Sequence, residues 1–176
     1  MDDHLDEEAK IMDEQNAEAQ PLSSDTFKAE ITNLRLPPIK SIPNTSTIKE
    51  AVDIMQKLKI GSVLIVDDKG KIDGIVTERD VLLKVIGIID DIANTPITKV
   101  MTPEPECLQK EDMICFAIHN MHVGGYRHVP IVDADDNPVA MVSIKDVMHY
   151  IFDHFPEDII NITSQPYRGP VSREGA

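Results

Sequence analysis

The sequence repeats itself at a spacing of 66 residues, and this repeat constrains the fold more than any other feature. Residues 31–82 align with residues 97–148 without a gap, and thirteen of the fifty-two aligned positions are identical. Self-similarity at a fixed period is typical of copies of one supersecondary unit that pack on each other. The identical positions in the first copy are Ile31, Thr32, Pro37, Ile48, Ala51, Met55, Val63, Ile65, Val66, Asp67, Val76, Asp80 and Val81.

Each copy begins with a predicted helix. Apolar residues at spacings of three and four predict helices that start at about Ile48 and Ile114. Thr47 or Ser46 is expected to cap the first helix, and Asp112 precedes the second helix in the same design. The same element therefore opens both copies.

Two strands and a second helix follow in each copy. Short β-branched runs separated by acidic turns predict the strands. The strands are expected at 63–66, 72–77, 129–132 and 139–142, and the second helices at about 78–88 and 145–155. Neither copy, with about fifty residues, would bury enough core alone. We therefore expect an α/β (α+β) fold in which two helix-strand-strand-helix repeats pack with pseudo-two-fold symmetry.

Four regions are expected along the chain. The repeats occupy residues 26–90 and 91–155, and the segments 1–25 and 156–176 flank them. Residues 1–20 contain eight acidic residues and one Lys, a composition that predicts disorder or a marginal solvated helix. A binding role for this acidic leader is the alternative. The C-terminal segment is expected to be a surface tail because it is rich in Pro and Gly.

Composition narrows the classes of function. With 31 acidic residues against 17 Lys and Arg, the formal charge is -14, so the chain would repel a nucleic-acid backbone. No apolar run approaches the ~20 residues of a spanning helix, and no signal-peptide pattern opens the chain. Cys107 and Cys115 lack the spacing of a disulfide framework or a zinc site. We expect a cytoplasmic protein with reduced thiols and no nucleic-acid or membrane partner.

The segments that close the two copies carry a specific pattern. Residues 74–80 and 140–146 each place a small residue and an apolar pair before Thr or Ser, with Asp three residues later. Residues 101–103 precede the second copy as a Met-Thr-Pro lead-in. From about residue 31 to 150 the chain resembles a pair of CBS domains, or Bateman module, and it is similar to the stand-alone bacterial type.

This resemblance implies a regulatory sensor rather than an enzyme. It would bind an adenine nucleotide (AMP, ADP or ATP), with or without Mg²⁺, in clefts between the repeats, and it would need no obligatory cofactor. In the family the Asp accepts hydrogen bonds from the ribose hydroxyls and the Thr or Ser adds a contact, which implies roles for Thr77 with Asp80 and for Ser143 with Asp146. Helix capping is the alternative role of these pairs.

Basic residues distinguish the two implied clefts. By the same resemblance, Arg127 and His128 precede a Pro-containing strand and would contact phosphates in the cleft of Asp80. The equivalent positions of the first copy are Gly61 and Ser62, which carry no charge. Arg79 and Lys145 directly precede Asp80 and Asp146. They are either supplementary contacts to the ligand or solvated surface residues.

Two further possibilities accompany this interpretation. The chain could be an interaction protein with empty clefts, or it could bind another adenosyl ligand, such as S-adenosylmethionine or a cyclic dinucleotide. A metal site is not expected, because His119 and His122 lack a third ligand at suitable spacing.

The second helices predict a homodimer. Each is apolar on more than one face, and only one face can cover its own strands. CBS pairs as a family dimerise through these helices, so the resemblance independently implies a dimer. The equivalent pairs Leu82 with Met148 and Ile86 with Phe152 are the candidate contacts. An unidentified protein partner is the remaining possibility.

Overall fold

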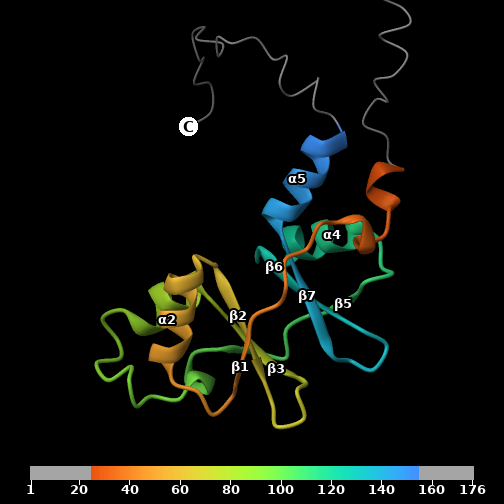
Figure 1. Ribbon diagram of the computed structural model, residues 1–176. Coiled ribbons are helices and arrows are strands. Elements are labelled where there is room, and N and C mark those ends of the chain that lie inside the picture. Colours follow the sequence, from red (N-terminus) through yellow and green to blue (C-terminus); the bar gives the residue numbers. More distant parts are fainter. Residues whose placement is uncertain (1–24, 155–176) are drawn as a thin grey trace, which may run out of the picture.

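The computed structural model describes residues 25–154, and the two repeats form two adjoining lobes, each with its own sheet (Figure 1). The first lobe holds α2 (Ile48–Leu58) and α3 (Glu78–Asp80), and the second holds α4 (Ile114–Gly124) and α5 (Ile144–His154). The first sheet contains β1 (Ser41–Pro43), β2 (Ser62–Val66), β3 (Ile72–Thr77) and β4 (Thr102–Pro103), and the second contains β5 (Leu108–Gln109), β6 (His128–Val132) and β7 (Pro138–Ser143). The predicted mixed fold is confirmed.

The two sheets share one topology. β1 runs parallel to β2, which pairs antiparallel with β3, and β5, β6 and β7 repeat this order. The register is also equivalent, because Val63 faces Val76 in one sheet and Val129 faces Val142 in the other. β4 adds a further antiparallel strand beside β3. The sequence repeat is therefore a structural repeat.

Helix capping differs between the repeats. At α2, Thr47 Oγ1 accepts from the Glu50 amide at 3.3 Å, and the Glu50 carboxylate accepts from the Thr47 amide at 2.7 Å. At α4 the capping position is Met113, which provides no side-chain acceptor. The prediction for Asp112 was wrong, because this residue lies one position too early and its carboxylate accepts from the Gln109 amide at 2.7 Å instead.

The second helix of the first repeat is shorter than predicted. α3 continues as one π-helical turn, Val81–Val85, after which Ile86 is extended. Gly87 then takes a φ of 73°, a left-handed conformation that glycine adopts at low cost. The predicted helix to residue 88 was therefore wrong beyond Val85, and Ile86 is not a helical equivalent of Phe152. In the second repeat, α5 follows the prediction as far as the described residues extend.

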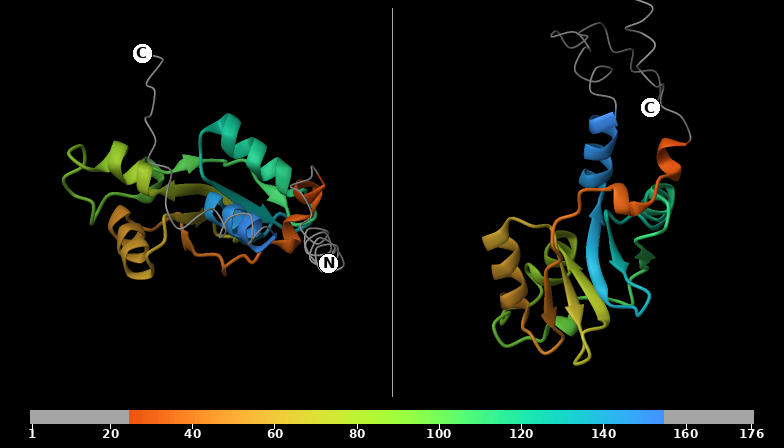
Figure 2. Two further views of the ribbon diagram at one scale, coloured as in Figure 1. Left: turned by 90° about the horizontal axis from the view of Figure 1, so that it is seen from above. Right: turned by 45° about the vertical axis from the view of Figure 1, so that its right-hand side comes forward.

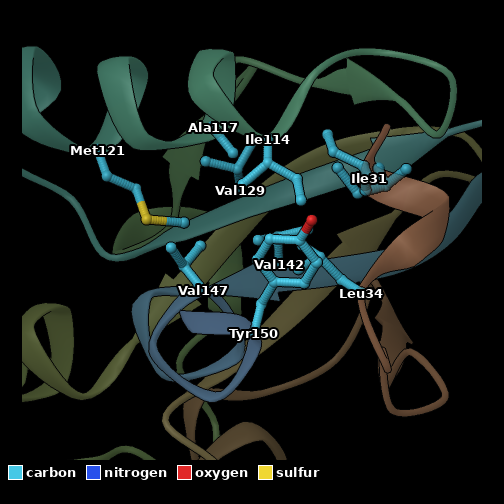
Figure 3. Close-up of a cluster of buried hydrophobic side chains, with 10 residues drawn as sticks. Ile31, Leu34, Ile114, Ala117, Met121, Val129, Val142, Val147 and Tyr150 are labelled. Carbon is cyan, nitrogen blue, oxygen red and sulfur yellow. The ribbon is translucent and has the colours of Figure 1, made fainter. Parts of the chain in front are cut away.

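The segment that opens each repeat packs into the core of the other repeat. Ile31 and Leu34 join the second core, beside Ile114 and Tyr150 (Figure 3), whereas Ile97 joins the first core. Backbone hydrogen bonds hold the exchange: the Ile31 amide donates to Asp112 at 2.8 Å, and the Ile97 amide donates to Ser46 at 2.9 Å. Figure 2 shows the orange segment crossing from the α4 side to β1. Each core is completed only by the other repeat.

Candidate functional site

A cavity of about 340 Å³ lies where the two repeats meet. Its walls come from Gly61, from residues 77–80 at the end of β3 and the start of α3, from residues 102–106, and from residues 126–128 before and within β6. The volume is that of a small-molecule site. β4 places residues 102–106 there, because Pro103 pairs with Gly74 of β3.

Asp80 is the buried charge of this cavity. Its exposed fraction is 9%, and it is the one charged residue classed as buried between residues 25 and 154. Oδ2 accepts from the Thr77 amide at 2.9 Å and from Thr77 Oγ1 at 2.7 Å, and Oδ1 lies 2.7 Å from Lys84 Nζ. Burial alone would raise the pKa of Asp80, but the hydrogen bonds from Lys84 and Thr77 outweigh it and hold the pKa below its usual value. Asp80 is therefore an anion at neutral pH.

The capping alternative describes real contacts. Thr77 and Asp80 form a capping box at α3, and at α5 Asp146 Oδ2 accepts from the Ser143 amide at 2.7 Å and from Ser143 Oγ at 2.6 Å. Capping does not exhaust either carboxylate, which offers about four lone-pair positions. Since Asp80 also lines the cavity, the same side chain can cap the helix and face a ligand.

Three basic side chains face the same cavity. Arg79 and His128 lie in its wall with Arg127, and Arg79 Nη1 donates to the Gly125 carbonyl across the repeat boundary at 2.7 Å. The structure thus brings together five predicted residues from two repeats, namely Thr77, Arg79, Asp80, Arg127 and His128.

The ring of His128 lies against Gly61 of the first repeat. A Cβ atom on Gly61 would be 3.5 Å from both Cε1 and Nε2 of His128. Burial and then the charge of Arg127 lower the pKa of His128, while Glu78 and Asp146 oppose the shift. The imidazole is therefore neutral at pH 7.

The other three predicted residues do not line this cavity. Ser143 ends β7, and Lys145 and Asp146 lie in the first turn of α5. Asp146 still acts on the pKa of His128, since its charge opposes the lowering of that pKa. The structure separates the predicted residues into one group around Asp80 and another around Asp146.

Among the side chains of the cavity wall that sequence reasoning missed are one aromatic and three acidic residues: Tyr126, Glu78, Glu104 and Glu106. The ring of Tyr126 lies directly over Gly124, where a Cβ atom would come within 2.1 Å of Cε1. Its hydroxyl donates to Glu106, and burial followed by this contact raises the pKa of Tyr126 to about 12. The sequence offered one indication of Tyr126, because this residue directly precedes Arg127.

No group of three or more His, Cys, Asp and Glu side chains within 25–154 could hold a metal ion. No helix of this part of the chain is both long and apolar enough to cross a membrane.

Comparison with known proteins identifies the family. The CBS domain family matches residues 31–90 and 97–153, which together exceed half of the chain. This chain belongs to the CBS domain family. The tandem CBS pair suggested by the sequence pattern is thereby confirmed.

Relatives and solved structures agree with this assignment. CBSCBSPB3 of Arabidopsis thaliana is 37% identical over 102 residues, which cover 58% of this chain and 18% of that protein. The match spans less than a quarter of the length of the first curated relatives. A CBS domain protein from Pyrobaculum aerophilum complexed with AMP has a TM-score of 0.64 at 23% identity and covers 72% of this chain and 98% of its own. CBSX2 in complex with AMP has a TM-score of 0.61 at 17% identity, and the match covers 70% of this chain and 96% of that chain.

Proposed function

We propose that this CBS pair is a non-enzymatic regulatory module that binds an adenine nucleotide in the Asp80 pocket. The observation that carries the proposal is the buried Asp80 carboxylate in one cavity with the Arg127 guanidinium. Two proteins of the same fold, the Pyrobaculum protein and CBSX2, were crystallised with AMP, which supports the choice of ligand.

The proposed roles follow from charge and hydrogen bonding. Asp80 accepts from the ribose hydroxyls with its remaining lone pairs, since Thr77 and Lys84 occupy only part of its capacity. Arg127 binds the phosphate through its planar fork of donors. Arg79, held by the Gly125 carbonyl, adds positive charge at the same wall.

Lys84 links ligand binding at Asp80 to the conformation of the chain. Its Nζ contacts Asp80 Oδ1 at 2.7 Å and donates to the Val100 carbonyl of the second repeat at 2.9 Å. Lys84 also belongs to the π-helical turn that carries Leu82 and Leu83. A ribose that hydrogen-bonds to the remaining lone pairs of Asp80 weakens the contact between Asp80 and Lys84 and so biases this turn, which is how the module reports binding.

The second cleft, around Asp146, is proposed as a weaker site. Ser143 and Lys145 accompany its carboxylate. The residues that take the places of Arg127 and His128 there are Gly61 and Ser62, which cannot neutralise a phosphate.

Calorimetric titration with a ligand panel tests the proposal. The full chain is titrated with adenosine, AMP, ADP, ATP with and without Mg²⁺, S-adenosylmethionine and a cyclic dinucleotide. We expect saturable binding of an adenine nucleotide that Asp80→Ala weakens at least about tenfold. Absence of binding by every nucleotide would leave the apolar helix surfaces as the functional feature and refute the proposal. Preferential binding of S-adenosylmethionine or the cyclic dinucleotide would show that the pocket takes a different class of adenosyl ligand.

A further inference from the structure

The Asp80 pocket carries more negative than positive charge. Its walls contain the carboxylates of Glu78, Glu104 and Glu106 in addition to Asp80, against the two guanidinium groups of Arg79 and Arg127. His128 adds no charge at pH 7, because its imidazole is neutral there. A cavity that binds a polyanion through its whole length would have the opposite balance.

Two of these carboxylates are fixed near the basic residues. Glu106 accepts from the Tyr126 hydroxyl, and it lines the same cavity as Arg127. Glu78 Oε2 would lie 3.5 Å from a Cβ atom on Gly61, the same point that the His128 ring approaches. A phosphate chain longer than one group would therefore share the cavity with these carboxylates.

The acidic wall is a property of this pocket and not of the repeat. In the other copy, the positions that correspond to Glu78, Glu104 and Glu106 hold Ile144, Pro38 and Lys40. The three carboxylates occur on one side of the pseudo-two-fold axis only. A structural requirement of the fold would have placed them on both sides.

We propose that Glu104 and Glu106, with Glu78, make the Asp80 pocket selective for a nucleoside monophosphate over the di- and triphosphate. This inference rests on the proposed function and deepens it, since it names the phosphate count that the site accepts. Arg127 neutralises one phosphate, and the acidic wall repels the second and third. The cavity of about 340 Å³ is near the lower end of the range for small-molecule sites, which also favours the shorter ligand.

The test compares AMP with Mg²⁺-free ATP by calorimetry in an Asp146→Asn background, where the Asp80 pocket alone keeps its carboxylate. We expect AMP to bind at least about tenfold more tightly than ATP, because like charges face each other only in the ATP complex. Glu104→Gln/Glu106→Gln keeps the hydrogen-bonding shape of both side chains. It should reduce the ratio to within about threefold, chiefly by tightening ATP binding.

Glu111→Gln is the matched control, because Glu111 is an exposed carboxylate outside the cavity wall. It should leave the ratio unchanged. Equal affinity for AMP and ATP in the starting protein would overturn the inference and leave the proposed function standing. A preference for AMP that survives the double substitution would overturn the role of these two glutamates. Binding of ATP without binding of AMP would likewise overturn the inference. Failure of both nucleotides to bind would instead contradict the proposed function.

Discussion

Asp80 combines two tasks in one carboxylate. Oδ2 completes the start of α3 through Thr77, and Oδ1 pairs with Lys84 at the edge of the cavity. Asp146 repeats the first task with Ser143, but the position of Lys84 holds Tyr150 in the second repeat, and its hydroxyl donates to the Thr26 carbonyl at 3.2 Å. The two equivalent aspartates therefore have different surroundings.

Substitution of the two aspartates should give unequal effects on AMP binding. We predict that Asp80→Ala weakens binding at least about tenfold, since it leaves the ribose hydroxyls without their charged acceptor. Asp146→Ala should change the affinity less than about threefold at the stronger site. Each substitution should also cost about 1 kcal/mol of stability through the lost cap. Calorimetry and urea unfolding measure the two effects. Equal losses of affinity, or the reverse order, would show that Arg127 and His128 are assigned to the wrong cleft or contribute less than proposed.

His128 should make AMP binding depend on pH. Its pKa is lowered in the free protein by burial and by Arg127, with Lys145 acting in the same direction and Glu78 and Asp146 opposing it. A bound phosphate stabilises the imidazolium, so binding raises this pKa and takes up protons. Affinity should therefore increase as the pH falls through the usual histidine range.

Calorimetry in two buffers of different ionisation enthalpy measures this proton uptake. His128→Gln serves as the control that removes the titrating ring. Uptake that persists unchanged in this variant would assign it to another group, such as the phosphate of the ligand, and would contradict the role of His128.

The residues of the pocket were predictable only in part. Asp80, Arg127 and His128 follow from the repeat and from the family pattern, because both fix their positions in sequence. Glu104 and Glu106 do not, since their place in the wall depends on the pairing of β4 with β3. A pairing of two residues leaves almost no pattern in the sequence.

At the scale of elements, the strands and first helices were the most predictable features. α2 and α4 begin at Ile48 and Ile114, as the apolar spacing indicates. The segments at Ile31 and Ile97 were not predictable, because an apolar residue with the same neighbours in both copies cannot indicate which lobe it joins. The sequence did not predict the π-helical turn or the end of the helix before Gly87, because the apolar pattern continues past that point.

The exchange of leading segments predicts crossed effects of core substitutions. Ile31 and Ile97 are both fully buried, so replacement by Ala should cost about 2–5 kcal/mol in each case. Ile31→Ala should reduce amide protection in β6 and β7, although Ile31 belongs to the first repeat. Ile97→Ala should reduce protection in β2 and β3. Hydrogen exchange measured by mass spectrometry follows both variants, and loss confined to the nearer repeat along the chain would contradict the exchange.

At the scale of the molecule, apolar surface is concentrated after the Asp80 site. Leu82, Leu83, Ile86 and Ile88 have exposed fractions between 62% and 66%. In the second repeat, Met148 and Phe152 are 43% and 41% exposed. Such patches commonly mark interfaces in soluble proteins, and we propose that a second copy of the chain covers them.

Light scattering at micromolar concentration tests the homodimer. Leu82→Glu should release monomers, because it buries a carboxylate in the apolar contact. Val139→Glu is the matched control, since Val139 is 41% exposed but lies on β7, away from the second helices. Deletion of residues 1–20 should leave the dimer intact. A monomeric wild-type protein would refute the interface, and loss of the dimer on deleting residues 1–20 would move it to that segment.

The pseudo-two-fold arrangement is the feature of the whole molecule that the sequence predicts best. A gapless repeat of 66 residues requires two equivalent units, and the structure has two equivalent sheets. The symmetry does not extend to chemistry, because the acidic wall and the basic residues of the Asp80 pocket occur once. We therefore propose the Asp80 pocket, rather than the cleft around Asp146, as the main nucleotide site.

A crystal structure of the full chain grown with AMP tests the central claim most directly. The account predicts the nucleotide in the Asp80 pocket, with both ribose hydroxyls within hydrogen-bonding distance of the Asp80 carboxylate and the phosphate at Arg127. AMP bound only at Asp146, or on a surface away from both aspartates, would contradict it.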